Sequence, residues 1–147
     1  MRLRPFRRGD LLTLYEIDQS CFAPGISYTR QELEDFTSHP LSQTWVAEEA
    51  PDIAGFLIAH REPGRILHII TIDVLEAWRR RGVGSLLMDA AEQWAGGHGL
   101  GVIGLETAED NLVAQKFYAA RGYRKVGEIK HYYADRSTAW VMVKELV

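Results

Sequence analysis

The chain has 147 residues, of which 46% are hydrophobic and 25% charged, as is typical of a globular protein with one domain over residues 1–147. The formal net charge is −3, whereas proteins that coat nucleic acid are usually strongly basic, so we expect no nucleic-acid partner. Cys21 is the only cysteine, which excludes an internal disulfide and agrees with a reducing compartment. No apolar run approaches the length of a membrane span, so we expect a cytoplasmic protein without a membrane partner.

Hydrophobic periodicity and turn signals divide the chain into strands and helices with short connections. Asp10 is expected as the N-cap of the first helix, and Thr29 with Glu32 forms a capping box before the second. In chain order, the predicted elements are a strand at 1–5, helices at about 10–20 and 30–38, strands at 44–48, 53–60 and 66–74, a helix at 83–97, a strand at 102–106, a helix at 111–121, and strands at about 123–133 and 138–146.

The strand–helix–strand order over residues 66–106 predicts a parallel pair of strands joined by a right-handed crossover. The remaining strands follow one another closely enough to pair in antiparallel fashion. The predicted class is therefore α/β, with a mixed sheet and helices on both of its faces.

The turn between the strand at 66–74 and the next helix has the features of an anion site. Glycines allow a ligand to approach the backbone closely, and the first turn of a helix offers N–H groups without internal partners. Three arginines directly before the turn add positive charge and hydrogen-bond donors. The residues expected to hold a phosphate or diphosphate are consecutive: Arg79, Arg80, Arg81, Gly82, Val83, Gly84 and Ser85.

The spacing of the glycines narrows the kind of phosphate ligand. A dinucleotide site would require a third glycine where Leu87 stands, and a nucleotide-triphosphate loop would require Gly-Lys-Ser/Thr, which is absent. The pattern Arg/Gln-x-x-Gly-x-Gly/Ala does match, with Arg79, Gly82 and Gly84 in the fixed positions. In this motif the sequence resembles the GNAT superfamily of N-acetyltransferases.

The resemblance has consequences for both the fold and the cofactor. It implies a mostly antiparallel seven-stranded sheet whose central parallel strands splay apart, with about four helices. It also implies that the arginine–glycine loop binds the pyrophosphate of acetyl-CoA. The pantetheine arm would then lie along the open backbone of Ile72, Asp73 and Val74 like an added strand. The side chains of Ile72 and Val74 can still belong to the core.

A second motif supplies candidates for the chemistry. Acetyl transfer to an amine benefits from a base for the amine and an acid for the leaving thiolate. The stretch from Leu105 through Asn111 to Tyr118 resembles the RimI-like branch, the N-terminal alanine acetyltransferases of ribosomal proteins. That resemblance implies that Glu106 is the general base, that Tyr118 is the general acid, and that Asn111 contacts the cofactor. Alternatively, Glu106 is a solvated strand end, Tyr118 a packing residue and Asn111 only a helix N-cap.

The acceptor site is less well defined by the sequence. Phe22 and Tyr28 lie in a loop that walls the acceptor site in the family, and Tyr132-Tyr133 matches a tyrosine pair beside the acceptor groove of the RimI-like branch. Strand packing is an equal alternative for this pair. His68 lies on a strand beside the expected cleft but is more typical of a structural histidine. We expect no metal, because no histidine has ligand spacing with another ligand residue.

Three functions remain open at this point. We expect acetyl transfer from acetyl-CoA to the N-terminal α-amine of a protein or peptide, by direct attack in a ternary complex. The first alternative is a small-molecule amine as acceptor, because related folds change acceptors by altering loops. The second is a non-catalytic CoA-binding or regulatory module, against which the presence of both Glu106 and Tyr118 argues. Either a monomer or a homodimer is compatible with the sequence.

Overall fold

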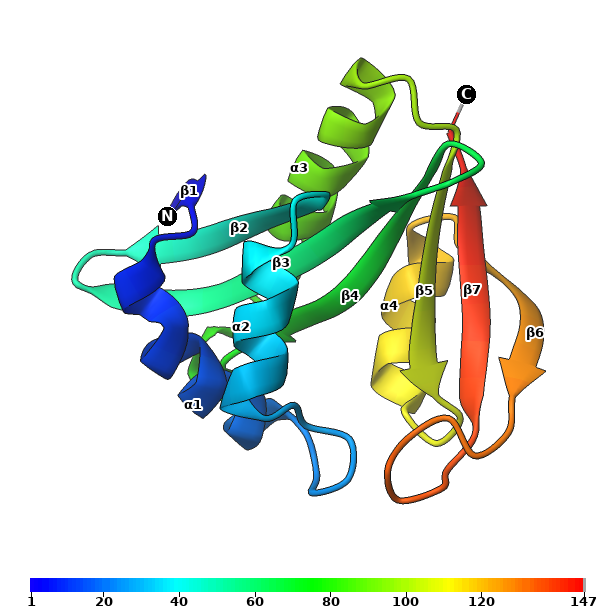
Figure 1. Ribbon diagram of the computed structural model, residues 1–147, viewed down its shortest axis with the longest axis horizontal. Coiled ribbons are helices and arrows are strands. Elements are labelled where there is room, and N and C mark those ends of the chain that lie inside the picture. The colour runs from blue at the N-terminus through cyan, green and yellow to red at the C-terminus, as the bar shows by residue number, and fades with distance from the viewer. Residues whose placement is uncertain (147) are drawn as a thin grey trace.

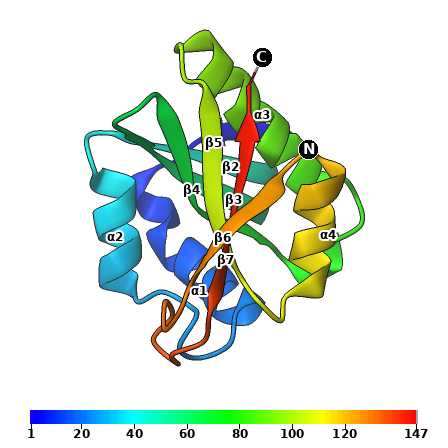
Figure 2. The ribbon, with the colours of Figure 1, turned by 90° about the vertical axis from the view of Figure 1, so that its right-hand side faces the viewer.

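The computed structural model describes residues 1–146, which form a seven-stranded sheet in the order β1-β2-β3-β4-β5-β7-β6 (Figure 1). The strands are β1 Arg2–Pro5, β2 Ser42–Glu49, β3 Asp52–Glu62, β4 Ile66–Val74, β5 Val102–Ala108, β6 Arg124–Ile129 and β7 Ala139–Glu145. The helices are α1 Leu11–Cys21, α2 Arg30–Ser38, α3 Val83–Gly97 and α4 Leu112–Ala120, with 3-10 turns at Arg8–Asp10 and Glu76–Trp78. Helices α1 and α2 cover one face of the sheet, and α3 and α4 cover the other (Figure 2).

Strands β4 and β5 form the parallel pair, and they part after a short contact. Their register ends at His68 opposite Gly104, although β4 continues along β3 to Val74 and β5 continues along β7 to Ala108. Figure 1 shows the two strands diverging beyond that point. The predicted fold, a mostly antiparallel sheet with a splayed parallel pair, is therefore confirmed.

Two apolar cores hold the helices to the sheet. Leu87, Met88 and Ala91 of α3 pack on one face with strand residues such as Leu67 and Ile103. Leu14 of α1 and Leu33 of α2 pack on the other face with Phe56 and Ile58 of β3. Helix α3 supplies its apolar residues at helical spacing, which is why it presents a continuous apolar stripe to the sheet.

A β-bulge in β4 decides which of its side chains face α1 and α2. Ile69 lies opposite Ala59 and Thr71 lies opposite Ile58, so Ile70 is the extra residue. A bulge of this kind reverses the alternation of faces along the strand. Asp73 lies opposite Phe56 and so faces α1 and α2, as His68 does before the bulge.

Two of the expected elements differ from the structure. The strand expected over about 123–133 ends at Ile129, because residues 130–138 form a turn in which the N–H groups of Tyr132 and Tyr133 donate to the carbonyl of Ser137. Asp10 is the N-cap residue of α1, as expected, but its side chain makes no capping hydrogen bond to that helix. Its carboxylate instead accepts hydrogen bonds from the Arg4 guanidinium at 2.8 and 2.9 Å, because this pairing compensates a nearly buried charge.

Candidate active site

The turn between β4 and α3 has the geometry expected of an anion cradle. Gly82 is the N-cap of α3 with φ of 80°, a conformation that glycine adopts without strain. A Cβ at Gly82 would meet no atom within 4 Å, so the space above this backbone is open. A Cβ at Gly84, by contrast, would lie 3.3 Å from the Phe117 ring, so Gly84 lets α3 and α4 approach each other closely. The first N–H groups of α3, those of Val83, Gly84 and Ser85, have no partner inside the helix.

The three arginines of the loop are exposed but are not equivalent. Arg79 folds back so that its Nε donates to the carbonyl of Val74 at 3.0 Å. Arg81 lies over the ring of Trp78, with the guanidinium carbon 5.2 Å from the ring centroid. Arg80 has a positive φ of 63° at the tip of the turn. Positive charge therefore surrounds an open turn of free N–H groups, which fits a diphosphate.

The edge of β4 beyond the splay fits the remainder of acetyl-CoA. Ile72, Asp73 and Val74 pair with β3 on one side and with no strand on the other, since the β4–β5 register stops at His68. An extended chain such as pantetheine can add to a free strand edge through backbone hydrogen bonds. Asn111 caps α4 by accepting from the Ala114 N–H at 3.1 Å, which leaves its amide NH2 without a partner among residues 1–146.

Glu106 lies at the mouth of the splay, within a network that sequence reasoning missed. Its Oε1 lies 2.7 Å from His68 Nε2 and accepts from the Tyr132 hydroxyl at 2.9 Å, while Oε2 has no partner in the described part of the chain. His68 Nδ1 lies 2.7 Å from Glu62 Oε2. Burial by itself lowers the pKa of His68, but the hydrogen bond and charge of Glu106, together with Glu62, outweigh it and raise that pKa above its usual value.

Tyr118 reaches the splay from α4. Only 6% of the residue is exposed, and its ring packs edge-on against Phe117 and Tyr123. Burial, with the charge of Asp73 second, raises the pKa of Tyr118 well above its usual value. The hydroxyl therefore keeps its proton at neutral pH, and it donates to no other residue within 1–146. The Tyr118 ring thus packs in the core, while its hydroxyl remains available as a hydrogen-bond donor.

The side chain of Asp73 forms a second unexpected feature, beneath the strand that the cofactor would follow. It is 1% exposed and lies against Asp18 of α1, which is fully buried. Thr71 donates to Asp73, and the Tyr28 N–H donates to Asp18, but one oxygen of each carboxyl has no partner. Burial, followed by the neighbouring Asp18, raises the pKa of Asp73 well above its usual value. A proton on Asp73 would remove one of the two adjacent buried charges.

The expected acceptor residues lie in two loops that contact each other. The Ala134 N–H donates to the Gly25 carbonyl at 2.9 Å, and a Cβ at Gly25 would lie 2.8 Å from Asp135. The two loops therefore enclose no open groove at this point. Tyr28 donates its hydroxyl to the Ile70 carbonyl at 3.3 Å, beside the splay. Phe22 is a half-buried residue at the end of α1.

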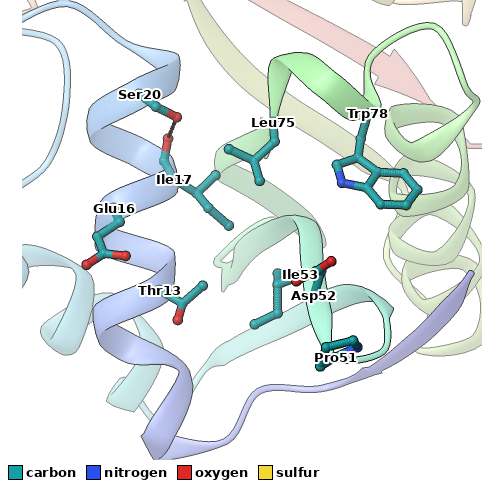
Figure 3. Close-up of a pocket in the computed structure, with 9 residues that line it drawn as sticks. All are labelled: Thr13, Glu16, Ile17, Ser20, Pro51, Asp52, Ile53, Leu75 and Trp78. Atoms are coloured by element: carbon teal, nitrogen blue, oxygen red, sulfur yellow. Dashed lines mark hydrogen bonds between the residues drawn. The ribbon is translucent and has the colours of Figure 1, made fainter.

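Tyr132 and Tyr133 occupy the turn rather than a strand, with their rings edge-on at 4.9 Å. The Tyr132 hydroxyl donates to Glu106. Two hollows of the described surface lie elsewhere. The second hollow, of about 440 Å³, lies between α1, the β2–β3 turn and Trp78, and neither Glu106 nor Tyr118 lines it (Figure 3). Within residues 1–146, no group of three or more His, Cys, Asp or Glu side chains is arranged to hold a metal ion. None of the helices described is long and apolar enough to cross a membrane.

Comparison with known proteins agrees with this geometry. Residues 11–123 match the Acetyltransferase (GNAT) family, and the chain belongs to that family. An N-alpha-acetyltransferase of Sulfolobus acidocaldarius is 31% identical over 114 residues, which cover 69% of this chain and 68% of that protein. The crystal structure of Ard1 from Thermoplasma volcanium matches at 27% identity with a TM-score of 0.88, over 99% of this chain and 97% of that one.

A more distant neighbour shares the fold. The crystal structure of the ribosomal-protein-S18-alanine N-acetyltransferase from Escherichia coli matches with a TM-score of 0.86 at 19% identity, over 98% of this chain and 92% of that one. The predicted family is therefore confirmed. The chain is an acetyl-CoA-dependent N-acetyltransferase, and its loop, helix N-terminus and free strand edge fit that acyl donor.

Proposed function

We propose that this acetyltransferase acts on the N-terminal α-amine of a protein or peptide, as an enzyme of the RimI-like branch, by direct attack of the amine in a ternary complex. The observation that carries the proposal is the state of Glu106. Its Oε1 is held by His68 and Tyr132, while Oε2 remains free at the mouth of the splay. An oriented carboxylate with one free oxygen is suited to take a proton from an amine.

The proposed roles follow from where each proton must go. Acetyl-CoA supplies an acetyl thioester when it is bound. Glu106 removes the proton that the amine loses as its nitrogen attacks, and Tyr118 gives its hydroxyl proton to the departing sulfur. The raised pKa of Tyr118 keeps that proton available through the neutral range.

The proposed cofactor contacts are those expected from the sequence. The free edge of Ile72, Asp73 and Val74 takes the pantetheine arm, and the Asn111 amide approaches it from α4. The pyrophosphate lies on the exposed arginines and the first N–H groups of α3. The members of this cradle are Arg79, Arg80, Arg81, Gly82, Val83, Gly84 and Ser85.

The preference for an α-amine rests on chemistry and on relatives. An α-amine has a pKa of about 7.7–8.0, so a single carboxylate suffices to complete its deprotonation near neutral pH. A lysine amine has a pKa of about 10.4, so far less of it is neutral at that pH and its deprotonation needs more help from the enzyme. The relative from Sulfolobus acidocaldarius is called an N-alpha-acetyltransferase. We assign Phe22, Tyr28 and Tyr133 to the wall of the acceptor site, and Tyr132 to both that wall and Glu106. We further propose that residues 1–147 form one domain that works in the cytoplasm.

The test is the rate of CoA release with three acceptor sets: peptides with a free N-terminus, the same peptides with a blocked N-terminus, and small amines including polyamines and amino sugars. The proposal predicts release with the free peptides only. Release with small amines alone would support the first alternative. Binding of acetyl-CoA without release for any acceptor would support a non-catalytic module.

A further inference from the structure

Three titratable side chains from adjacent strands form a continuous chain of contacts beside the splay. Glu62 at the end of β3, His68 in β4 and Glu106 in β5 are joined through the two ring nitrogens of His68, each 2.7 Å from a carboxylate oxygen. The exposed fraction of the side chain falls from 43% for Glu62 to 23% for His68 and 16% for Glu106. The imidazole thus connects a solvated carboxylate to a shielded one.

The two contacts together define the protonation of the ring. A neutral imidazole has one N–H donor and one lone pair, so it can donate to only one of two ionised carboxylates. The other contact would then place a lone pair against a negative oxygen. Two contacts of 2.7 Å to two carboxylates are both favourable when the ring carries protons on both nitrogens.

Among the described residues, no other positively charged side chain contacts Glu106 in place of His68. His60 lies opposite His68 in the β3–β4 register, but its Nε2 is 3.1 Å from the Phe36 carbonyl and its pKa is lowered by burial. From the β6–β7 turn, the neutral Tyr132 hydroxyl donates to the same oxygen of Glu106. Tyr28, on the α1–α2 loop, is turned to the Ile70 carbonyl.

We propose that His68 is a positioning residue, which as an imidazolium clamps Oε1 of Glu106 and leaves Oε2 to take the proton of the acceptor amine. Glu62 holds the imidazolium in place from the solvent side. This inference rests on the proposed role of Glu106 as the base. No proton leaves the clamp during the reaction: the amine N–H bond breaks, an O–H bond forms at Oε2, and Glu106 later releases that proton to water.

The clamp predicts a signature in the dependence of kcat on pH, because His68→Gln keeps a donor to Glu106 but carries no charge. At high pH the wild type should lose activity as His68 loses its proton, and this basic limb should be absent in His68→Gln. Glu62→Gln should start the basic limb at lower pH, because Glu62 helps to raise the pKa of His68.

The experiment measures kcat from pH 5.5 to 9.5 for wild type, His68→Gln, Glu62→Gln and the matched control His60→Gln, at saturating substrates. We expect His68→Gln to lower kcat about 10- to 100-fold near neutral pH, the size of one charge-assisted hydrogen bond. The KM for acetyl-CoA should stay within about twofold, because the clamp touches no part of the proposed cofactor cradle. His60→Gln should keep the wild-type profile.

A direct measurement of the ring complements the kinetics. Nitrogen NMR of the His68 side chain should show both nitrogens protonated at pH 7 in wild type, and a lower titration point in Glu62→Gln. A neutral His68 ring at pH 7, or an unchanged pH profile in an active His68→Gln variant, would overturn the clamp and leave the proposed function intact. If wild type itself acetylates no acceptor, the proposed function fails first, and the NMR result still decides whether the ring is charged.

Discussion

Asp73 of β4 lies against Asp18 of α1 beneath the strand edge proposed for the cofactor, and one oxygen of each carboxyl is buried without a partner. The pair ties the first helix to β4. It also links β4 to the α1–α2 loop, because the Tyr28 N–H donates to Asp18 at 2.7 Å. The proposed cofactor strand and the proposed acceptor wall therefore share one buried support.

The pair makes stability depend on pH. The pKa of Asp73 is raised in the folded state, so its favourable contribution is complete below the unfolded value near 3.9 and is lost as pH rises toward the folded value. Asp73→Asn replaces the proton by an amide donor and should raise the melting temperature at pH 8 by about 2 °C or more. Thermal unfolding at pH 4 and pH 8 measures the difference in melting temperature between Asp73→Asn and wild type. This difference should be smaller at pH 4 than at pH 8.

Asp52→Asn is the matched control, since Asp52 is exposed at the start of β3 and should show no comparable change. A loss of stability in Asp73→Asn that is equal at both pH values would contradict a protonated Asp73.

The phosphate cradle is tested by substituting Gly82. A tryptophan there should fill the open space above the α3 N-terminus and also meet the strain of a φ of 80°. Gly82→Trp should abolish the rise in melting temperature that acetyl-CoA causes in wild type. Gly96→Ala, near the far end of α3 with no atom within 4 Å of the added Cβ, should keep that rise. A normal shift in Gly82→Trp would remove this turn from the cofactor site.

Tyr118 and Tyr123 offer a matched pair for the proposed acid. Tyr118→Phe removes the free hydroxyl and should lower kcat about 100-fold with little change in the KM for acetyl-CoA. The Tyr123 hydroxyl donates to Glu92 at 3.1 Å, away from the splay. Tyr123→Phe should therefore lower the melting temperature and leave kcat almost unchanged. Steady-state kinetics measure kcat for both variants. Small and equal decreases in kcat would show that Tyr118 serves only in packing.

Local signals in the sequence predicted the features that depend on neighbouring residues. The capping box of α2 forms as expected, with Thr29 Oγ1 accepting from the Glu32 N–H at 3.1 Å. Helix α3 begins at Val83 after its N-cap Gly82, and this start was also predicted from local features, namely two nearby glycines and the helical period of apolar residues. The parallel pair followed from the strand–helix–strand order.

The features that sequence reasoning missed join residues far apart in the chain. Asp18 and Asp73 meet only because the bulge at Ile70 turns Asp73 toward α1, and no local pattern predicts a bulge of this kind. His68 meets Glu106 across the β4–β5 register, and Glu62 reaches it because β3 continues two residues beyond His60. The end of β6 was missed because tyrosines favour strands, while here backbone bonds to Ser137 hold them in a turn.

The most direct test of the central claim uses one peptide with a free N-terminus and an internal lysine, incubated with the enzyme and acetyl-CoA at pH 7.0 and 8.5. Tandem mass spectrometry then locates the acetyl group. The account predicts acetylation of the α-amine at both pH values, with the lysine unmodified, and a strong loss of product with Glu106→Gln that is larger at pH 7.0 than at 8.5. Acetylation of the lysine alone, or full activity in Glu106→Gln, would contradict it.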